Sequence, residues 1–110
     1  MSEADADMFV VLYRWRIKPG HEAQFVDAWG QATRELLLRG SLGSRLHRGD
    51  DGLWYGYAQW PSDAVRADAR ARTGERSGAR MRAAIEESMP ETRLTPGVDF
   101  LQAPNAAAGG

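Results

Sequence analysis

The segment from Phe9 to Leu37 limits this chain to folds that begin with a β-strand followed by a helix. Every second side chain between Phe9 and Lys18 is large and apolar, which is typical of a strand with one buried face. That face would carry Phe9, Val11, Tyr13, Trp15 and Ile17. Pro19-Gly20 ends the strand, and apolar side chains then recur at helical spacing from Phe25 to Leu37. We therefore predict a strand and an amphipathic helix, with Gly40 as a residue suited to follow the helix end.

A β-hairpin is predicted after this helix. Ser41 to Arg48 alternates weakly, and the turn-forming run Gly49-Asp50-Asp51-Gly52 follows it. Leu53 to Trp60 is rich in aromatic residues, which favour strands. These two runs would form neighbouring antiparallel strands.

A second helix and a last strand complete the pattern. Ser62 is a suitable N-cap for a helical stretch that Thr73-Gly74 interrupts and that resumes at Glu75, running through Ser88. Pro90 ends it. Thr92 to Gln102 reads as a weaker strand that contains Pro-Gly, which suits the edge of a sheet.

The predicted order is β-α-β-β-α-β, an α+β, ferredoxin-like arrangement in which both helices pack on one face of a four-stranded antiparallel sheet. The second face of the first strand still offers Val10 and Leu12 beside Arg14 and Arg16. Such a surface is too apolar to be left to water alone. We therefore expect a homodimer that forms by packing of the two sheet faces.

Composition bounds the class of protein. A chain of 110 residues with 43% hydrophobic and 26% charged residues and a formal net charge of −1 is typical of one globular domain. We expect that domain over residues 8–102, with loose tails at 1–7 and 103–110. The near-neutral charge argues against nucleic acid as a partner, although Tyr55 and Tyr57 beside Arg14 and Arg16 offer a hint of it. No run of apolar residues is long enough to span a membrane, and we expect a cytoplasmic protein.

Metal and cofactor chemistry has few candidate residues. Zero cysteines exclude disulfides, thiolate metal sites and cysteine nucleophiles within this chain. His21 and His47 are the two histidines, so a multi-histidine metal site would also need carboxylates or a second subunit. We predict no metal site and no cofactor.

Two segments resemble a known family. Lys18 to Phe25, which reads KPGHEAQF, together with Tyr57 to Ala64, which reads YAQWPSDA, is similar to the antibiotic biosynthesis monooxygenase family of dimeric α/β barrels. The resemblance spans residues 8–102. It implies pairing through the sheets and an apolar pocket between sheet and helices. Some members oxidise polycyclic aromatic compounds with molecular oxygen and without metal or flavin, some degrade haem, and many have no established activity.

Few residues of this chain match functional residues of the family one by one. Trp60 stands where oxygenases of the family often place a pocket tryptophan at the end of the third strand. Haem-degrading members use an asparagine on the first strand and a histidine on the second helix, whereas here Tyr13 lies near the first position and no histidine follows His47. Asn105, the only asparagine, falls in the predicted C-terminal tail. The resemblance therefore does not supply a complete catalytic set.

Trp60, Tyr13 and Trp15 are the predicted substrate-binding residues. Trp60 shares a strand face with Trp54, and the small Gly56 and Ala58 between them would leave space for a flat aromatic ligand. In the alternative, helix residues such as Phe25 or Trp29 fill that space as ordinary core. A buried Tyr13 needs a hydrogen-bond partner, which is either a substrate oxygen or a local backbone group or water.

Two polar residues of the hairpin are candidate catalytic groups. His47 is able to act as a general base near neutral pH, and Arg45 is able to stabilise developing negative charge. In the alternative, His47 is a solvated residue beside a turn. The arginines of the second helix form either an anion-binding strip or an ordinary solvated face.

Two functions remain open from the sequence. One is a cofactor-independent monooxygenase of a small electron-rich aromatic substrate bound between sheet and helices. The other is a non-catalytic dimeric α/β barrel that binds a small apolar ligand or serves a stress-related role.

Overall fold

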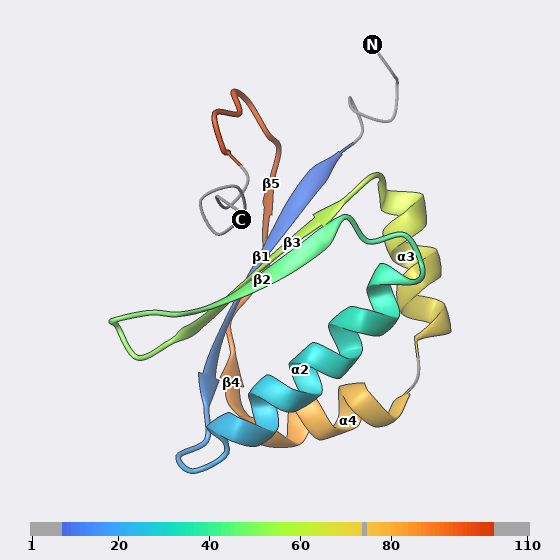
Figure 1. Ribbon diagram of the computed structural model, residues 1–110. Coiled ribbons are helices and arrows are strands. Elements are labelled where there is room, and N and C mark those ends of the chain that lie inside the picture. Colours follow the sequence, from blue (N-terminus) through green and yellow to red (C-terminus); the bar gives the residue numbers. More distant parts are fainter. Residues whose placement is uncertain (1–7, 74, 103–110) are drawn as a thin grey trace, which may run out of the picture.

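The computed structural model describes residues 8–73 and 75–102, so the two predicted tails, 1–7 and 103–110, lie outside the described residues. The described elements follow one another along the chain and are labelled in Figure 1. They are β1 (Phe9–Ile17), α2 (Glu22–Leu37), β2 (Gly43–Arg48), β3 (Trp54–Trp60), α3 (Asp63–Arg72), α4 (Glu75–Ala84), β4 (Ile85–Ser88) and β5 (Thr92–Leu94).

One antiparallel sheet forms the centre of the molecule. Its strand order is β2-β3-β1-β4, and β5 also pairs with β1. The helices α2, α3 and α4 all lie on one side of the sheet (Figure 1). The predicted α+β, ferredoxin-like arrangement is confirmed, and the sheet of the single chain is open rather than closed into a barrel. We call the side of this sheet away from the helices the open face; near Val10, which is 3% exposed, the segment after β5 borders it.

The prediction that the second helix runs through Ser88 is wrong. Helix α4 ends at Ala84, and Ile85–Ser88 is strand β4, which pairs with the end of β1. The backbone of β1 explains the switch, because the N–H and C=O groups on its side away from β3 need partners and β4 supplies them. Tertiary pairing thus overrides a local pattern that reads as helical.

The last strand is also shorter than predicted. Only Thr92–Leu94 of the predicted strand from Thr92 to Gln102 pairs with β1, at Val10 to Leu12. β4 and β5 are therefore successive parts of one edge. Between them the chain stays on the sheet, because Met89 N donates to Arg14 O at 2.9 Å. Pro96, which has no N–H to donate, follows shortly after the pairing stops.

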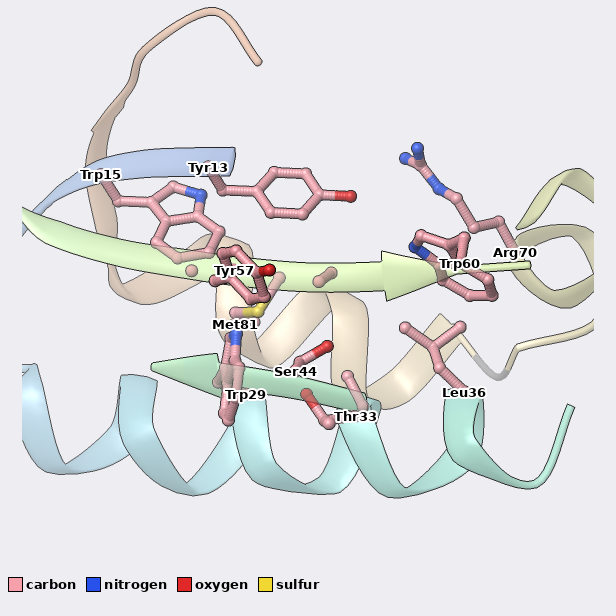
Figure 2. A pocket seen from close by; sticks show the side chains of 13 residues that line it. Tyr13, Trp15, Trp29, Thr33, Leu36, Ser44, Tyr57, Trp60, Arg70 and Met81 are labelled. Atoms are coloured by element: carbon pink, nitrogen blue, oxygen red, sulfur yellow. The ribbon is translucent and has the colours of Figure 1, made fainter. Parts of the chain in front are cut away.

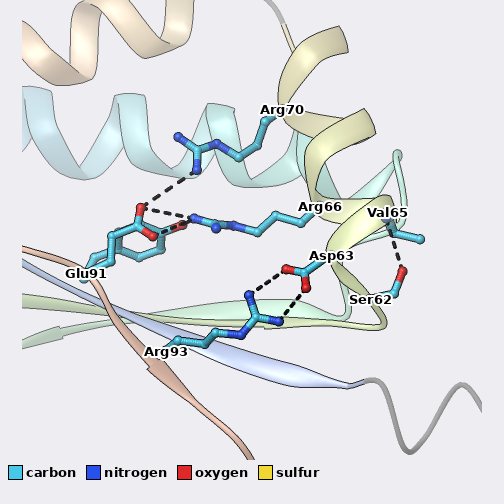
Figure 3. A network of polar contacts seen from close by, with 8 residues as sticks. Ser62, Asp63, Val65, Arg66, Arg70, Glu91 and Arg93 are labelled. Carbon is cyan, nitrogen blue, oxygen red and sulfur yellow. Dashed lines mark hydrogen bonds and ion pairs between the residues drawn. The ribbon is translucent and has the colours of Figure 1, made fainter.

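The break in the second helical segment is confirmed, and so is its cap. The Ser62 hydroxyl accepts a hydrogen bond from Val65 N at 3.2 Å, which satisfies one free donor at the start of α3 (Figure 3). Helix α3 ends at Arg72, where Thr73 Oγ1 donates to Ala69 O at 2.7 Å, and α4 begins at Glu75. The break divides the segment into two shorter helices.

The hydrophobic core lies between the sheet and the helices, in two clusters. One cluster contains Phe9, Val11, Ala58, Trp60 and Ala69, and the other contains Trp15, Ile17, Phe25 and Ala84. Phe25, which is fully buried, meets both Trp15 and Trp54 edge-on, with ring centroids 5.2 and 5.8 Å away. Edge-to-face pairs of this kind each contribute about 0.5–1.5 kcal/mol beyond the area that they bury.

No helix among the described residues is long and apolar enough to cross a membrane.

Candidate functional site

A cavity of about 160 Å³ lies between the sheet and the helices (Figure 2). All three helices and the strands β1, β2 and β3 contribute to its wall. The lining residues are Tyr13, Trp15, Trp29, Ala32, Thr33, Leu36, Ser44, Gly56, Tyr57, Ala58, Trp60, Arg70 and Met81. The three predicted substrate-binding residues, Tyr13, Trp15 and Trp60, thus border one pocket.

Small residues on β3 make room for this pocket. Gly56 and Ala58 lie on the helix-facing side of the strand, and both are buried. A Cβ atom at Gly56 would lie 2.7 Å from Trp15 Cη2, closer than real Cβ contacts allow. Glycine at this position therefore lets the Trp15 ring lie close over the strand.

The helix residues that were predicted to fill the space do so only in part. Phe25 packs against Trp15 and Trp54 and closes the space at that end of the sheet. Trp29 borders the pocket rather than filling it. A cavity therefore remains between Trp15 and Trp60, beside a well-packed core.

Two parallel rings form one wall of the pocket. Tyr13 and Trp15 lie two residues apart on the same face of β1, and their rings stack with centroids 5.5 Å apart and planes only 5° from parallel. This arrangement makes a flat apolar surface. A planar ring bound against this wall would gain the offset contacts that aromatic pairs favour.

Several of the side chains that border the pocket carry polar groups. In Figure 2 the Tyr13 hydroxyl, the Trp60 indole nitrogen and the Arg70 guanidinium lie toward the same end. Trp60 is only 1% exposed, and its Nε1 has no hydrogen-bond partner in the described part of the chain. Buried donors are nearly always paired in native proteins, so this indole N–H suits a ligand that carries an acceptor.

A guanidinium holds the Tyr13 hydroxyl in place. Arg66 Nη2 donates to Tyr13 Oη at 2.8 Å and to both carboxylate oxygens of Glu91 at 3.1 Å (Figure 3 shows the Arg66–Glu91 contacts). Arg70 Nη1 lies 3.8 Å from the same carboxylate. Burial lowers the pKa of Arg66, but the hydrogen bond with Tyr13 and the carboxylate of Glu91 outweigh burial and raise the pKa above its ordinary value. Arg66 is therefore a fixed positive charge directly behind the pocket.

The predicted catalytic residues Arg45 and His47 lie elsewhere in this chain. Both border a hollow lined by Gly43, Ser44, Arg45, His47, Tyr57, Gln59, Leu101 and Gln102. They pair across the hairpin with the half-buried Tyr57 and Tyr55, and neither Arg45 nor His47 lines the aromatic pocket. The structure thus brings together the three predicted binding residues and leaves the two predicted catalytic residues in a different hollow.

The sequence analysis did not name Glu91 as a site residue, and it considered Arg66 only as one of the second-helix arginines for which an anion-binding strip was left open. A signal was present, because Arg66 and Arg70 flank the fully buried Ala69 on α3 and so lie beside the buried side of that helix. Other arginines of α3 and α4 are engaged more superficially, as in the pairs of Arg72 with Asp68 and Arg80 with Asp27. Glu91 was hidden because it lies between β4 and β5, where the sequence predicted a break.

Metal ligands do not cluster in the described part of the chain. In residues 8–73 and 75–102, no group of three or more His, Asp or Glu side chains is placed to hold a metal ion.

The fold and the pocket define a ferredoxin-like α+β protein with an aromatic site between sheet and helices. The model of the antibiotic biosynthesis monooxygenase family matches residues 8–87, and the chain therefore belongs to that family. The resemblance inferred from the sequence is thus confirmed. Among proteins with curated descriptions, none matches the chain significantly.

Solved structures show the same fold. SnoaB, a cofactor-independent oxygenase from Streptomyces nogalater, superposes with a TM-score of 0.75 at 19% sequence identity, covering 88% of this chain and 100% of SnoaB. Rv0793 from Mycobacterium tuberculosis superposes with a TM-score of 0.72 at 13% identity, covering 86% of this chain and 100% of Rv0793. At these identities the likeness establishes the fold alone.

Proposed function

We propose that this protein is a cofactor-independent monooxygenase of a small electron-rich aromatic substrate that binds in the pocket beside Trp60. The observation that carries the proposal is an aromatic-walled cavity with an unpartnered indole N–H and a polarised tyrosine hydroxyl at one end. The family supports it, as does the fold shared with SnoaB, itself a cofactor-independent oxygenase.

The proposed reaction needs no electrons from outside. A substrate methylene group beside an aromatic ketone loses a proton, and the resulting anion gives electrons to molecular oxygen. One oxygen atom remains in the product as a new carbonyl group, and the other leaves with the two methylene hydrogens as water. One methylene group and one oxygen molecule thus give one carbonyl group and one water molecule, so the substrate itself is the reductant.

The protein would contribute orientation and charge stabilisation in this reaction. The wall of Tyr13 and Trp15 holds the flat ring, and the apolar surroundings keep water away from the reactive anion. The donors at the Tyr13 and Trp60 end stabilise the oxygen on which negative charge develops. Arg66, acting through Tyr13, then has the role that the sequence suggested for Arg45.

Oxygen uptake tests the proposal. An oxygen electrode should record consumption by the purified, chelator-treated protein with hydroxynaphthalenes, whose keto tautomers carry such a methylene group, and with one- and two-ring aromatic ketones. Mass spectrometry should find a product with one more oxygen atom and two fewer hydrogen atoms than the substrate. We expect Trp60→Phe to lower the rate about tenfold or more, because a donor to the developing charge is lost. Arg72→Gln, which changes an exposed arginine of α3, is the matched control and should keep the rate. No uptake above buffer with any substrate in the panel would contradict the proposal.

The role of His47 as general base remains a prediction, and one variant decides it. His47 does not line the pocket of its own chain. His47→Gln should abolish oxygen uptake if His47 removes the substrate proton, and should leave uptake unchanged if the proton passes to water. The rate of oxygen uptake by His47→Gln therefore separates the two cases, and an unchanged rate would contradict a role for His47 as general base.

A second candidate function is ligand binding without turnover. It is favoured by one observation, which is that no carboxylate or imidazole of the described residues lines the pocket. Under this alternative the aromatic compound quenches the fluorescence of the pocket tryptophans, and the oxygen concentration stays constant over the same period. Binding of the aromatic compound together with oxygen uptake supports the proposed oxygenase activity instead.

We also propose that two chains pair through the open faces of their sheets. The segment after β5 carries Val98, Phe100 and Leu101, which are 80%, 87% and 82% exposed, and such an exposed apolar group is typical of an interaction surface. Sedimentation equilibrium should give twice the chain mass, and Phe100→Glu should shift it toward the single chain. Leu38→Glu, at an equally exposed leucine at the end of α2, is the control and should leave the mass unchanged. A folded wild-type monomer would contradict the pairing.

A further inference from the structure

We infer that the pocket binds an aromatic compound of one or two fused rings through an ionised oxygen, which Tyr13 Oη–H and Trp60 Nε1–H hold by hydrogen bonds. Arg66 is the positioning residue that orients and polarises Tyr13. The inference rests on the proposed function and names the class of substrate for the same site. It assigns roles to Arg66 and Glu91 that the family resemblance did not supply.

The hydrogen bond from Arg66 leaves the Tyr13 proton free to enter the pocket. A guanidinium has only donors, so the contact of 2.8 Å between Arg66 Nη2 and Tyr13 Oη uses the phenol oxygen as acceptor. The Tyr13 hydroxyl hydrogen must then find an acceptor elsewhere. Donation from a cation also strengthens the hydroxyl as a donor, because hydrogen bonds in a chain polarise one another.

The charges around this end of the pocket favour an anion. Arg66 and Arg70 are two positive groups, and Glu91 is the carboxylate that both of them contact. The side chain of Arg66 is only 15% exposed, so solvent screens its charge less than it screens the charge of Arg70, which is 56% exposed. These three side chains together keep an excess of positive charge next to the two donors.

Trp60 supplies the second donor. Its indole nitrogen lies at the pocket in Figure 2 and has no acceptor among the described residues. An indole N–H is only a donor, so the matching ligand group must be an acceptor. One ligand oxygen with several lone pairs, such as a phenolate or enolate oxygen, satisfies both Trp60 and Tyr13.

The size of the cavity suits a small ligand. Its volume of about 160 Å³ is close to that of engineered apolar cavities of about 150 Å³ that bind benzene, and well below the roughly 300 Å³ at which pockets for drug-sized ligands begin. A ring system of one or two fused rings therefore suits this volume. The flat wall of Tyr13 and Trp15 suits such a planar molecule.

The bound ionisation of 2-naphthol tests the inference directly. Absorbance titration of 2-naphthol with saturating full-length protein should show the pKa of the bound naphthol lowered by about one unit or more, because anion binding about tenfold tighter than neutral binding produces that shift. Tyr13→Phe and Trp60→Phe should each remove most of the shift. Arg66→Gln should reduce it although Tyr13 is still present, and Arg66→Lys should restore part of it.

Two controls isolate the oxygen contact. Naphthalene, which has the same rings and no oxygen, should bind with an affinity that Tyr13→Phe leaves unchanged. Arg72→Gln should leave the naphthol shift unchanged, because Arg72 pairs with Asp68 on the surface of α3. Circular dichroism establishes that each variant is folded, and Trp60→Phe tests the inference independently if an Arg66 variant is not.

Failure of the inference differs from failure of the proposed function. Absence of naphthol binding, an unshifted bound pKa, or an equal shift in Tyr13→Phe would overturn the inference even if oxygen is consumed. A lowered pKa of the bound naphthol that depends on Tyr13 and Trp60, without oxygen uptake, would support the inference. The same result would contradict the proposed oxygenase activity.

Discussion

The two faces of the sheet carry similar aromatic side chains, yet their surroundings give them different chemistry. On the helix-covered face, the Tyr13 hydroxyl accepts a hydrogen bond from Arg66, a mostly buried cation. On the open face, the Tyr55 hydroxyl donates to the exposed carboxylate of Asp51. The first tyrosine keeps its hydrogen to offer a ligand, whereas the second already donates its hydrogen to a neighbour. Burial and the sign of the neighbouring charge, rather than residue type, distinguish a candidate site from a surface contact.

The largest expected difference between covered and exposed positions concerns packing. Phe25→Ala should lower the free energy of unfolding by about 3–5 kcal/mol, because it empties a fully buried position between Trp15 and Trp54. Val26→Ala, at the next residue of the same helix and 43% exposed, should change it by less than about 0.5 kcal/mol. Urea denaturation measures both. Similar losses in the two variants would contradict the assignment of the core.

The next difference concerns the space under Trp15. Gly56→Ala should lower the free energy of unfolding by about 1–3 kcal/mol, because the new methyl group forces the buried Trp15 ring away from the strand. Gly30→Ala is the matched control, since a Cβ atom there meets only Arg34 Nη2 at 3.8 Å. Because alanine favours helices, Gly30→Ala should raise the free energy of unfolding by about 0.5–1 kcal/mol. Thermal unfolding of both variants measures the contrast, and a stabilised Gly56→Ala protein would show that Trp15 does not need the space.

The hydroxyl groups of the two tyrosines provide a sharper comparison. Tyr13→Phe should lower the free energy of unfolding by about 1 kcal/mol, because Arg66 loses an acceptor in a half-buried position. Tyr55→Phe should lower it less, because Asp51 is exposed and water replaces the lost donor. Chemical denaturation at pH 7 distinguishes the two. The opposite ranking would mean that the open face holds the stronger contact.

The smallest expected effect is a pH dependence of stability that arises from the ion pair of Asp63 with Arg93. Arg93 donates two hydrogen bonds to Asp63 at 2.6 and 2.8 Å and so lowers the pKa of that carboxyl below its ordinary value of 3.8 (Figure 3). A lowered folded-state pKa contributes stability that is present above the unfolded value and is lost as the pH falls through the folded value. The stability difference between wild type and Asp63→Asn should therefore stay constant from about pH 7 to 5 and shrink below about pH 4.

A double-mutant cycle checks the source of that dependence. In an Arg93→Gln background, Asp63→Asn should have little pH-dependent effect, because the donor that lowers the Asp63 pKa is gone. Arg93 Cζ also lies 3.7 Å from the centroid of the Phe9 ring. Both proteins compared in the Arg93→Gln background lack that contact, so its loss does not affect the comparison. An unchanged pH dependence in this background would show that another group controls the loss of stability in acid.

The sequence predicted the parts of this molecule that depend on local pattern. Alternation along β1 placed Tyr13 and Trp15 on the helix-covered face, and the small Gly56 and Ala58 indicated the pocket. The cap at Ser62 was predictable because it depends only on near neighbours along the chain. Each of these features is decided within a few residues.

The parts that failed depend on distant pairing. Ile85–Ser88 continues a helical pattern, and only the unpaired edge of β1 turns it into a strand. Arg66 and Glu91 are 25 residues apart, and Arg66 meets Tyr13 across 53 residues, so no local pattern linked them. The site therefore could be outlined from sequence, whereas the contacts of Arg66 with Tyr13 and Glu91 could not.

The central claim is that the helix-covered face, rather than the open face, receives the ligand, and indole NMR signals test it most directly. The four tryptophans give four indole N–H signals, assigned by single Trp→Phe variants. On addition of 2-naphthol, we expect a downfield shift of the Trp60 indole proton as it gains an acceptor. The Trp54 signal, which lies on the same face but outside the pocket lining, should stay in place. A stationary Trp60 signal at saturating ligand would contradict the claim.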